Sequence, residues 1–132
     1  MFAERLAIDE RDALVVLLAF MAATDGEVRD VERDLVRQLC ERLDIDGDPF
    51  DRIADSSLYE LCERLVTPHS RRIAIVEMIK AAYVDGEFHS SEERSIRVLA
   101  ELMEVDGDTV TALEDWVKRG LIWKAEGAVL LG

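Results

Sequence analysis

The chain has 132 residues, 49% of them hydrophobic and 34% charged, which is enough apolar material for one domain with a buried core. Its 29 acidic residues outnumber 16 Lys and Arg, and a net charge of −13 disfavours nucleic acid and anionic lipid as partners while it favours cations and basic protein patches. Only 7 Gly and 2 Pro are present, too few for the many turns of an all-β protein.

In the first half of the chain, apolar residues recur at the 3.6-residue spacing of α-helices. A helix that is apolar on most faces is predicted over residues 9–24, and Gly26 suits the left-handed conformation that ends many helices. A second helix is predicted over residues 30–43. Two short helices, over residues 49–54 and 57–66, complete this half.

The second half begins with a signal that the first half also contains. Asp48-Pro49 and Thr67-Pro68 each place a capping side chain before a Pro at the first helical position. The helix from residue 68 to 83 is long and apolar, and another helix is predicted over residues 90–103. No stretch alternates polar and apolar residues as a strand does. The chain is therefore predicted to be all-α, a compact bundle of about six or seven helices with the two most apolar ones at its centre.

The C-terminal segment is rich in apolar residues. A helix capped by Asp108 or Thr109 is predicted to break near Gly120, and residues 121–131 are expected to pack back on the domain as a final helix. Both Trp residues are expected to anchor these helices by packing. A loose final helix would instead expose Trp123 and the leucines near the end as a surface suited to a partner.

The chain contains an internal repeat. Residues 25–48 recur 60 positions later as residues 85–108, without any insertion, which indicates a duplicated helix–loop–helix unit. We therefore predict a single domain over residues 1–132, with repeat halves over about 9–48 and 68–108. The identical pairs are Asp25/Asp85, Gly26/Gly86, Glu27/Glu87, Glu32/Glu92, Arg37/Arg97, Leu39/Leu99, Glu41/Glu101, Asp46/Asp106, Gly47/Gly107 and Asp48/Asp108.

Each half carries three carboxylates, in an Asp-Gly-Glu turn and in a Glu at the start of the next helix. The Asp follows the C-terminal end of a helix, where the helix dipole disfavours an anion by roughly 0.3–1 kcal/mol. Free carbonyl oxygens and carboxylates, without thiols or paired His, form a hard environment that favours Ca²⁺ or Mg²⁺ over Zn²⁺. The candidate metal ligands are Asp25, Glu27, Glu32, Asp85, Glu87 and Glu92.

The same residues also have a purely structural interpretation. Glu32 and Glu92 occupy the first turn of a predicted helix, where Glu is favourable without a metal and can complete a capping box. Gly26 and Gly86 then serve as C-caps, and the spacing departs from that of the EF-hand loop. No nucleophile–base pair stands out, which indicates that the protein is not an enzyme.

The motif Asp-Gly-Glu-apolar-x-x-x-Glu, present twice, resembles the TerB-like tellurite-resistance family, and similar domains accompany membrane-anchored DnaJ-type co-chaperones. The resemblance covers roughly residues 9–117. It implies an all-helical fold of about seven helices in two halves, in which the six acidic residues of the motifs bind divalent metal or a partner. Arg29 and His89 stand where family members commonly have Ser, and Arg29 is placed to neutralise part of the first cluster.

These features predict a non-enzymatic domain that binds divalent cations, a protein partner, or both, in a metal or envelope stress response. Cys40 and Cys62 lie in apolar helical stripes and are expected to be buried, reduced thiols of a cytoplasmic protein. The longest apolar run, residues 13–23, is shorter than the roughly 20 residues that span a bilayer, so any contact with the inner membrane is expected through a membrane-protein partner. The alternative is a metal-free adaptor that uses its acidic face or its apolar C-terminal helix.

Overall fold

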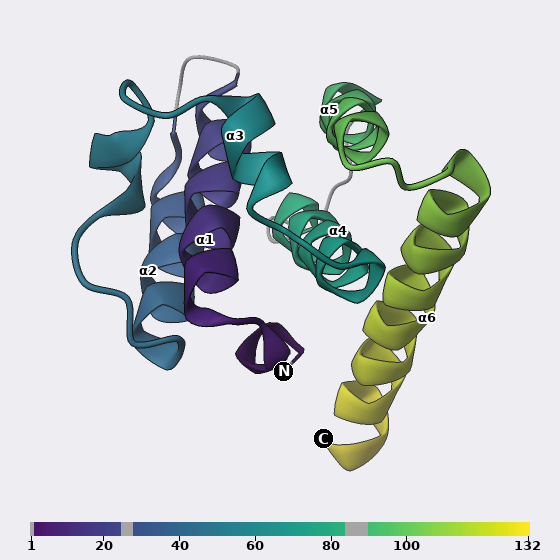
Figure 1. Ribbon diagram of the computed structural model, residues 1–132. Coiled ribbons are helices and arrows are strands. Elements are labelled where there is room, and N and C mark those ends of the chain that lie inside the picture. The colour runs from purple at the N-terminus through teal and green to yellow at the C-terminus, as the bar shows by residue number, and fades with distance from the viewer. Residues whose placement is uncertain (1, 25–27, 84–89) are drawn as a thin grey trace.

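The computed structural model describes residues 2–24, 28–83 and 90–132. Every regular element in these ranges is a helix, and none of the described residues forms a strand (Figure 1). The predicted all-α bundle is therefore confirmed. In chain order the elements are the 3-10 helix η1 (Ala3–Arg5), α1 (Ile8–Ala23), α2 (Asp30–Arg42), the 3-10 helix η2 (Pro49–Arg52), α3 (Leu58–Glu63), α4 (Pro68–Ala82), α5 (Ser90–Leu102) and α6 (Gly107–Leu131).

Helices α1 and α4 form the buried centre of the bundle. Residues 13–19 of α1 and, sixty positions later, residues 73–79 of α4 are all buried. This explains why both helices are apolar on most faces in the sequence. Helices α2 and α5 instead bury one face each, at equivalent positions of the repeat. The buried residues on these faces are Val36, Leu39 and Cys40 in α2, and Ile96, Leu99 and Ala100 in α5.

The two halves have the same arrangement of helices. α1 packs against α2, α4 packs against α5, and α1 and α4 contact each other at the centre (Figure 1). The elements that pack on each helix pair differ, because η2 and α3 lie on α1 whereas the long α6 lies on α4 and α5. The repeat therefore fixes the paired helices, and the segments after these pairs make the halves unequal.

Both halves end their outer helix in the same turn. After α2, Asp44 has a φ of 56° and the Ile45 N–H donates to the carbonyl of Cys40 at 2.9 Å. After α5, Glu104 has a φ of 60° and Val105 N–H donates, also at 2.9 Å, to the carbonyl five residues earlier. These are Schellman caps, in which Gly is the usual left-handed residue. The same cap at positions sixty apart supports the duplication.

The two predicted caps followed by Pro are confirmed. The Asp48 side chain accepts the Phe50 N–H at 3.0 Å, and the Thr67 hydroxyl accepts the Ser70 N–H at 3.0 Å. The helix after Asp48 is a short 3-10 turn and α3 is shorter than the predicted 57–66. Beyond α3 the chain turns, and the Val66 N–H bonds to a side chain of α1 instead of continuing the helix.

The prediction for the start and middle of the last helix is wrong. α6 is continuous from Gly107 to Leu131, without a break at Gly120. Its cap is Asp106, whose carboxylate accepts the Thr109 N–H at 2.7 Å, and not Asp108 or Thr109. One interior Gly costs a helix only about 1 kcal/mol relative to Ala, so Gly120 alone does not end it.

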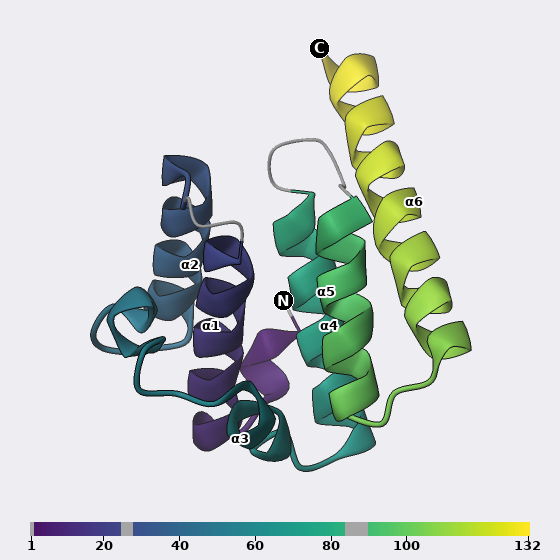
Figure 2. The ribbon, with the colours of Figure 1, turned by 90° about the horizontal axis from the view of Figure 1, so that it is seen from above.

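The expectation that residues 121–131 pack back on the domain is also wrong. α6 has 25 residues against the 15 of α4, so its C-terminal part extends beyond the helices it packs on (Figure 2). Val117 is its last buried residue. Trp116 is half-exposed and contacts the Phe2 ring at a centroid distance of 5.8 Å, whereas Trp123 is 76% exposed and anchors no helix of the described chain.

Candidate functional site

The described ends of four helices lie at one end of the bundle. α1 and α4 end there, and α2 and α5 begin there (Figure 2). Of the six candidate ligands, Glu32 and Glu92 lie within the described residues. The four candidate ligands outside the described residues are Asp25, Glu27, Asp85 and Glu87.

Glu32 lies in the first turn of α2 with 17% of its side chain exposed. Its Oε1 accepts the backbone N–H of Arg29 at 3.2 Å and pairs with the Arg29 Nε at 3.1 Å. The contact to the amide is one half of a capping box, and Arg29 has no side-chain acceptor with which to supply the other half. The expected neutralisation by Arg29 is therefore confirmed at Glu32.

Glu92 is the equivalent residue of the second half, in the first turn of α5. The side chain is half-buried and its Oε2 atom is buried. Glu32 and Glu92 border one small cavity of about 30 Å³. The two motifs therefore converge at their helix-start Glu residues. The remaining lining is apolar and consists of Leu18, Met21, Ala22, Leu35, Val36, Ala81 and Ala82.

Two carboxylates alone do not complete a Ca²⁺ or Mg²⁺ site, because these ions take six or more oxygen ligands. Among the described residues, no three or more His, Cys, Asp or Glu side chains gather closely enough to hold a metal ion. His69 is exposed at the start of α4. Cys40 and Cys62 are free, buried thiols whose pKa is raised by burial, as expected for core residues.

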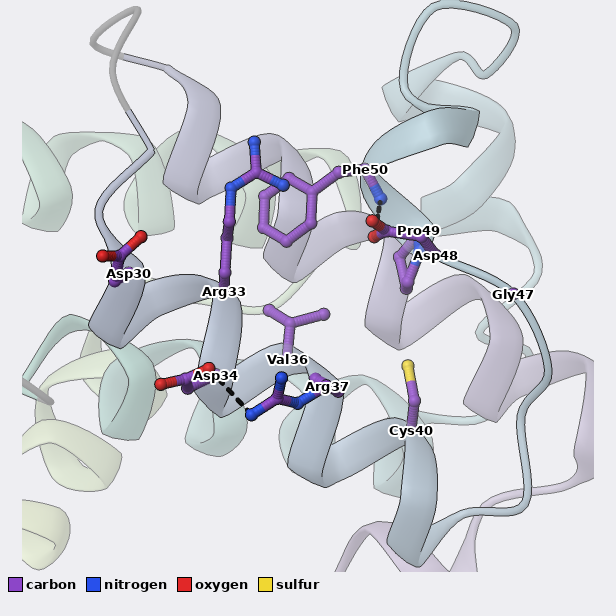
Figure 3. A pocket seen from close by; sticks show the side chains of 10 residues that line it. All are labelled: Asp30, Arg33, Asp34, Val36, Arg37, Cys40, Gly47, Asp48, Pro49 and Phe50. Carbon is purple, nitrogen blue, oxygen red and sulfur yellow. Dashed lines mark hydrogen bonds and ion pairs between the residues drawn. The ribbon is translucent and has the colours of Figure 1, made fainter.

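A larger cavity of about 560 Å³ lies between α2 and the turn over residues 47–50 (Figure 3). The Arg33 guanidinium lies over the Phe50 ring, 4.8 Å from its centroid. Arg37 pairs with Asp34 at 2.9 Å on the same wall. The groove thus presents both charges beside an aromatic face. Its lining residues are Asp30, Arg33, Asp34, Val36, Arg37, Cys40, Gly47, Asp48, Pro49 and Phe50.

Sequence reasoning missed this groove because its charged residues lie on the outer face of α2, where charges are ordinary. The available signal was Phe50, an aromatic residue directly after a capped Pro in a short predicted helix. The stacking of Arg33 on Phe50 brings together residues of two different elements, and such a contact has no local signature in the chain.

Asp12 of α1 holds two Arg side chains of the segment that covers it. Its Oδ1 and Oδ2 accept from Arg52 Nη1 and Nη2 at 2.5 and 2.6 Å, and Arg64 Nη2 donates to Oδ2 at 3.1 Å. The hydrogen bonds from Arg52 lower the pKa of Asp12, against the opposing effect of burial. This bidentate pair fastens η2 and the end of α3 to α1.

Glu10 is a buried carboxylate that joins α1 to the chain just before α4. It accepts the Ala7 N–H at 3.0 Å and the Val66 N–H at 3.1 Å. Burial opposes its ionisation, but hydrogen bonds from Ser70 and from these two amides outweigh burial and lower the pKa of Glu10. Asp12 and Glu10 are both engaged in holding elements together.

Comparison with protein-family models, with curated proteins and with solved structures found no match to this chain. No described helix has the length and apolar character needed to cross a membrane.

Proposed function

We propose that this chain is a non-enzymatic, acidic helical domain of the TerB-like type that binds a divalent cation where its two halves meet. The supporting observation is that Glu32 and Glu92, the same position of the two repeats, border one small cavity. By its resemblance, such a domain acts in a metal or envelope stress response in the cytoplasm, with a protein partner that can be a membrane protein.

The physical reason for a cation is the repulsion between carboxylates. Two negative charges beside one largely apolar cavity disfavour each other, and a hard cation offsets both. Arg29 offsets part of the charge of Glu32 by its ion pair at 3.1 Å. The motif assigns the further oxygen ligands to Asp25, Glu27, Asp85 and Glu87, and this oxygen set favours Ca²⁺ or Mg²⁺ over Zn²⁺.

The proposal of a non-enzymatic role is supported by the hydrogen bonds and the burial of four titratable groups among the described residues. Asp12 and Glu10 have lowered pKa values because they hold structural hydrogen bonds. Burial raises the pKa of the Cys40 and Cys62 thiols, which makes them poor nucleophiles. These contacts stabilise the fold and leave these groups without a reacting partner.

Isothermal titration of metal-free protein with Ca²⁺, Mg²⁺ and Zn²⁺ tests the proposal. We expect binding of Ca²⁺ or Mg²⁺ that weakens at least tenfold in the double variant Glu32→Gln, Glu92→Gln. The matched control is Glu41→Gln, Glu101→Gln, which removes the same charge from exposed, repeat-equivalent positions and should keep the affinity. Wild-type affinity no tighter than millimolar, or equal affinity in both double variants, contradicts the cation site.

The second candidate function is a metal-free adaptor that contacts a protein through its acidic face or its C-terminal helix. The observation that favours it is the exposed apolar surface on the last part of α6, including Trp123. An adaptor of this kind keeps its partner in a pulldown with chelator present, whereas a cation-dependent domain releases it.

A further inference from the structure

The C-terminal part of α6 is a helix surface that the rest of the described chain does not cover. Val117 is the last buried residue, and the helix continues to Leu131 past the ends of α4 and α5 (Figure 2). A soluble domain rarely exposes so many large apolar side chains together without a partner for them. The exposed large apolar residues of this helix are Trp116, Leu121, Ile122, Trp123, Val129, Leu130 and Leu131.

Part of this surface repeats every seven residues. Trp116, Trp123 and Leu130 are spaced by seven, and Gly120 and Gly127 lie between them, also seven apart. This spacing puts all five on one stripe of the helix, with large side chains alternating with gaps. Trp123 and Leu130 are 76% and 84% exposed.

The two glycines have no structural reason within the described chain. A Cβ at Gly120 or Gly127 would meet no atom within 4 Å, and neither residue has a left-handed backbone. Each interior Gly costs the helix about 1 kcal/mol relative to Ala. These glycines lower helix stability and are not needed for packing within the described chain. They therefore indicate a surface that another molecule approaches closely.

The stripe is complementary to itself. When two copies lie antiparallel, a Trp of one copy meets a Gly gap of the other, and the same contact recurs across a twofold axis. We propose that this protein forms a homodimer through antiparallel pairing of the C-terminal parts of α6, with Trp123 of each copy seated over a glycine of the other. The inference is independent of the proposed cation site, since the pairing needs no metal.

The charges beside the stripe select the antiparallel orientation. Arg119 and Glu126 each precede a glycine of the stripe and flank the same side of it. In an antiparallel pair, Arg119 of one copy faces Glu126 of the other, twice. In a parallel pair, Arg119 faces Lys124 of the other copy, and like charges repel. Lys124 meets its own counterpart in the antiparallel pair, but its long side chain can extend into water.

The expected dimer is weak and reversible. The exposed parts of two Trp side chains and one Leu amount to roughly 400 Å² for each copy, or roughly 800 Å² for a pair, which is at the small end of specific interfaces. Sedimentation velocity across a wide range of protein concentration therefore measures it best. We expect the mass to rise with concentration from 14.9 kDa toward twice that value.

Substitutions on and off the stripe distinguish this specific interface from nonspecific hydrophobic association. Trp123→Glu should leave a monomer at concentrations where the wild type is mostly dimeric. Ile122→Glu, which changes a half-exposed apolar residue on another face of the same helix, should retain the dimer. Gly120→Leu with Gly127→Leu should remove the dimer while raising the melting temperature, because Leu favours the helix and fills the gaps.

A charge exchange tests the orientation. Arg119→Glu alone should weaken the dimer at least threefold, and adding Glu126→Arg should restore it. A failure of the double exchange to restore pairing overturns the antiparallel arrangement. The homodimer itself is overturned by a wild type that stays monomeric throughout, by a dimer that survives Trp123→Glu, or by a monomer that instead cosediments with phosphatidylglycerol vesicles.

Discussion

The junction after α2 and the junction after α5 begin from the same repeat and close differently. In the first half, Arg37 pairs with Asp34 on the surface, where 67% of the Arg37 side chain is exposed. A groove of about 560 Å³ then stays open between α2 and residues 47–50.

In the second half, the equivalent Arg97 reaches from α5 to the first turns of α6. It donates to the Gly107 carbonyl at 3.1 Å and to the Thr111 hydroxyl at 3.0 Å, and it pairs with Glu114 at 3.4 Å. The cause lies in the residues after the shared Asp-Gly-Asp, since Pro49 starts a short 3-10 turn where the second half continues into a long helix. The same Arg is therefore present in both halves, but its contacts depend on the segment that follows it in each half.

Among equivalent positions of the two halves, the largest difference in the stability effect of a substitution should appear at Asp12. Its repeat-equivalent position holds Arg72, which is exposed. Because Asp12→Ala leaves Arg52 and Arg64 without their shared carboxylate, we expect the free energy of unfolding in urea to fall by about 2 kcal/mol. Arg72→Ala should change it by less than about 0.5 kcal/mol. Equal effects at the two positions would show that the ion pairs of Asp12 do not distinguish the halves.

The same residue predicts the response to acid. The folded pKa of Asp12 lies below its usual value of 3.8, so in acid the unfolded chain takes up a proton that the folded chain does not. The stabilisation by Asp12 is complete above the usual value and is lost as pH falls through the folded pKa. Asp12→Asn should therefore lose stability at pH 7 and show a smaller further loss below about pH 4 than the wild type. The check is urea unfolding at several pH values.

Substitution of the two equivalent arginines, Arg97 and Arg37, should give stability losses that differ by an intermediate amount. Arg97→Ala removes hydrogen bonds to α6 and leaves the half-buried Glu114 without its guanidinium, so we expect a loss of about 1–2 kcal/mol. Arg37→Ala removes one exposed ion pair, which is worth less than about 0.5 kcal/mol. Thermal and urea unfolding of both variants measure the contrast, and a larger effect of Arg37→Ala would reverse it.

The smallest difference in stability effect between the halves is expected at the Schellman caps. Left-handed backbone strains any residue with a Cβ, and Asp tolerates it better than Glu. We expect Glu104→Gly to stabilise the protein by about 0.5–1 kcal/mol, and Asp44→Gly to do so by less. Melting temperatures of the two single variants decide the order. A destabilising effect of either change would mean that the present side chain contributes more than its backbone strain costs.

The helices of both halves could be predicted because their signals are local. The 3.6-residue period and the caps at Asp48 and Thr67 place most boundaries within a few residues of the observed ones. The choice between a packed and an exposed Trp123 could not be made in this way, because it depends on how far α6 extends beyond α4. The meeting of Glu32 and Glu92 depends on the packing of α1 against α4, which the sequence implied only through its internal repeat.

The buried carboxylate of Glu10 has a consequence for folding cooperativity. It accepts an amide of its own helix start from Ala7 and one from Val66, which lies 56 positions further along the chain. Until α4 has docked, Glu10 keeps its water and gains only the local contact. Once α4 has docked, an opening that breaks the bond to Val66 without admitting water leaves a buried carboxylate and a buried amide unpaired, which is costly. Glu10 thus links α1 of the first half to the segment that leads into α4 of the second, and we expect the two halves to unfold together.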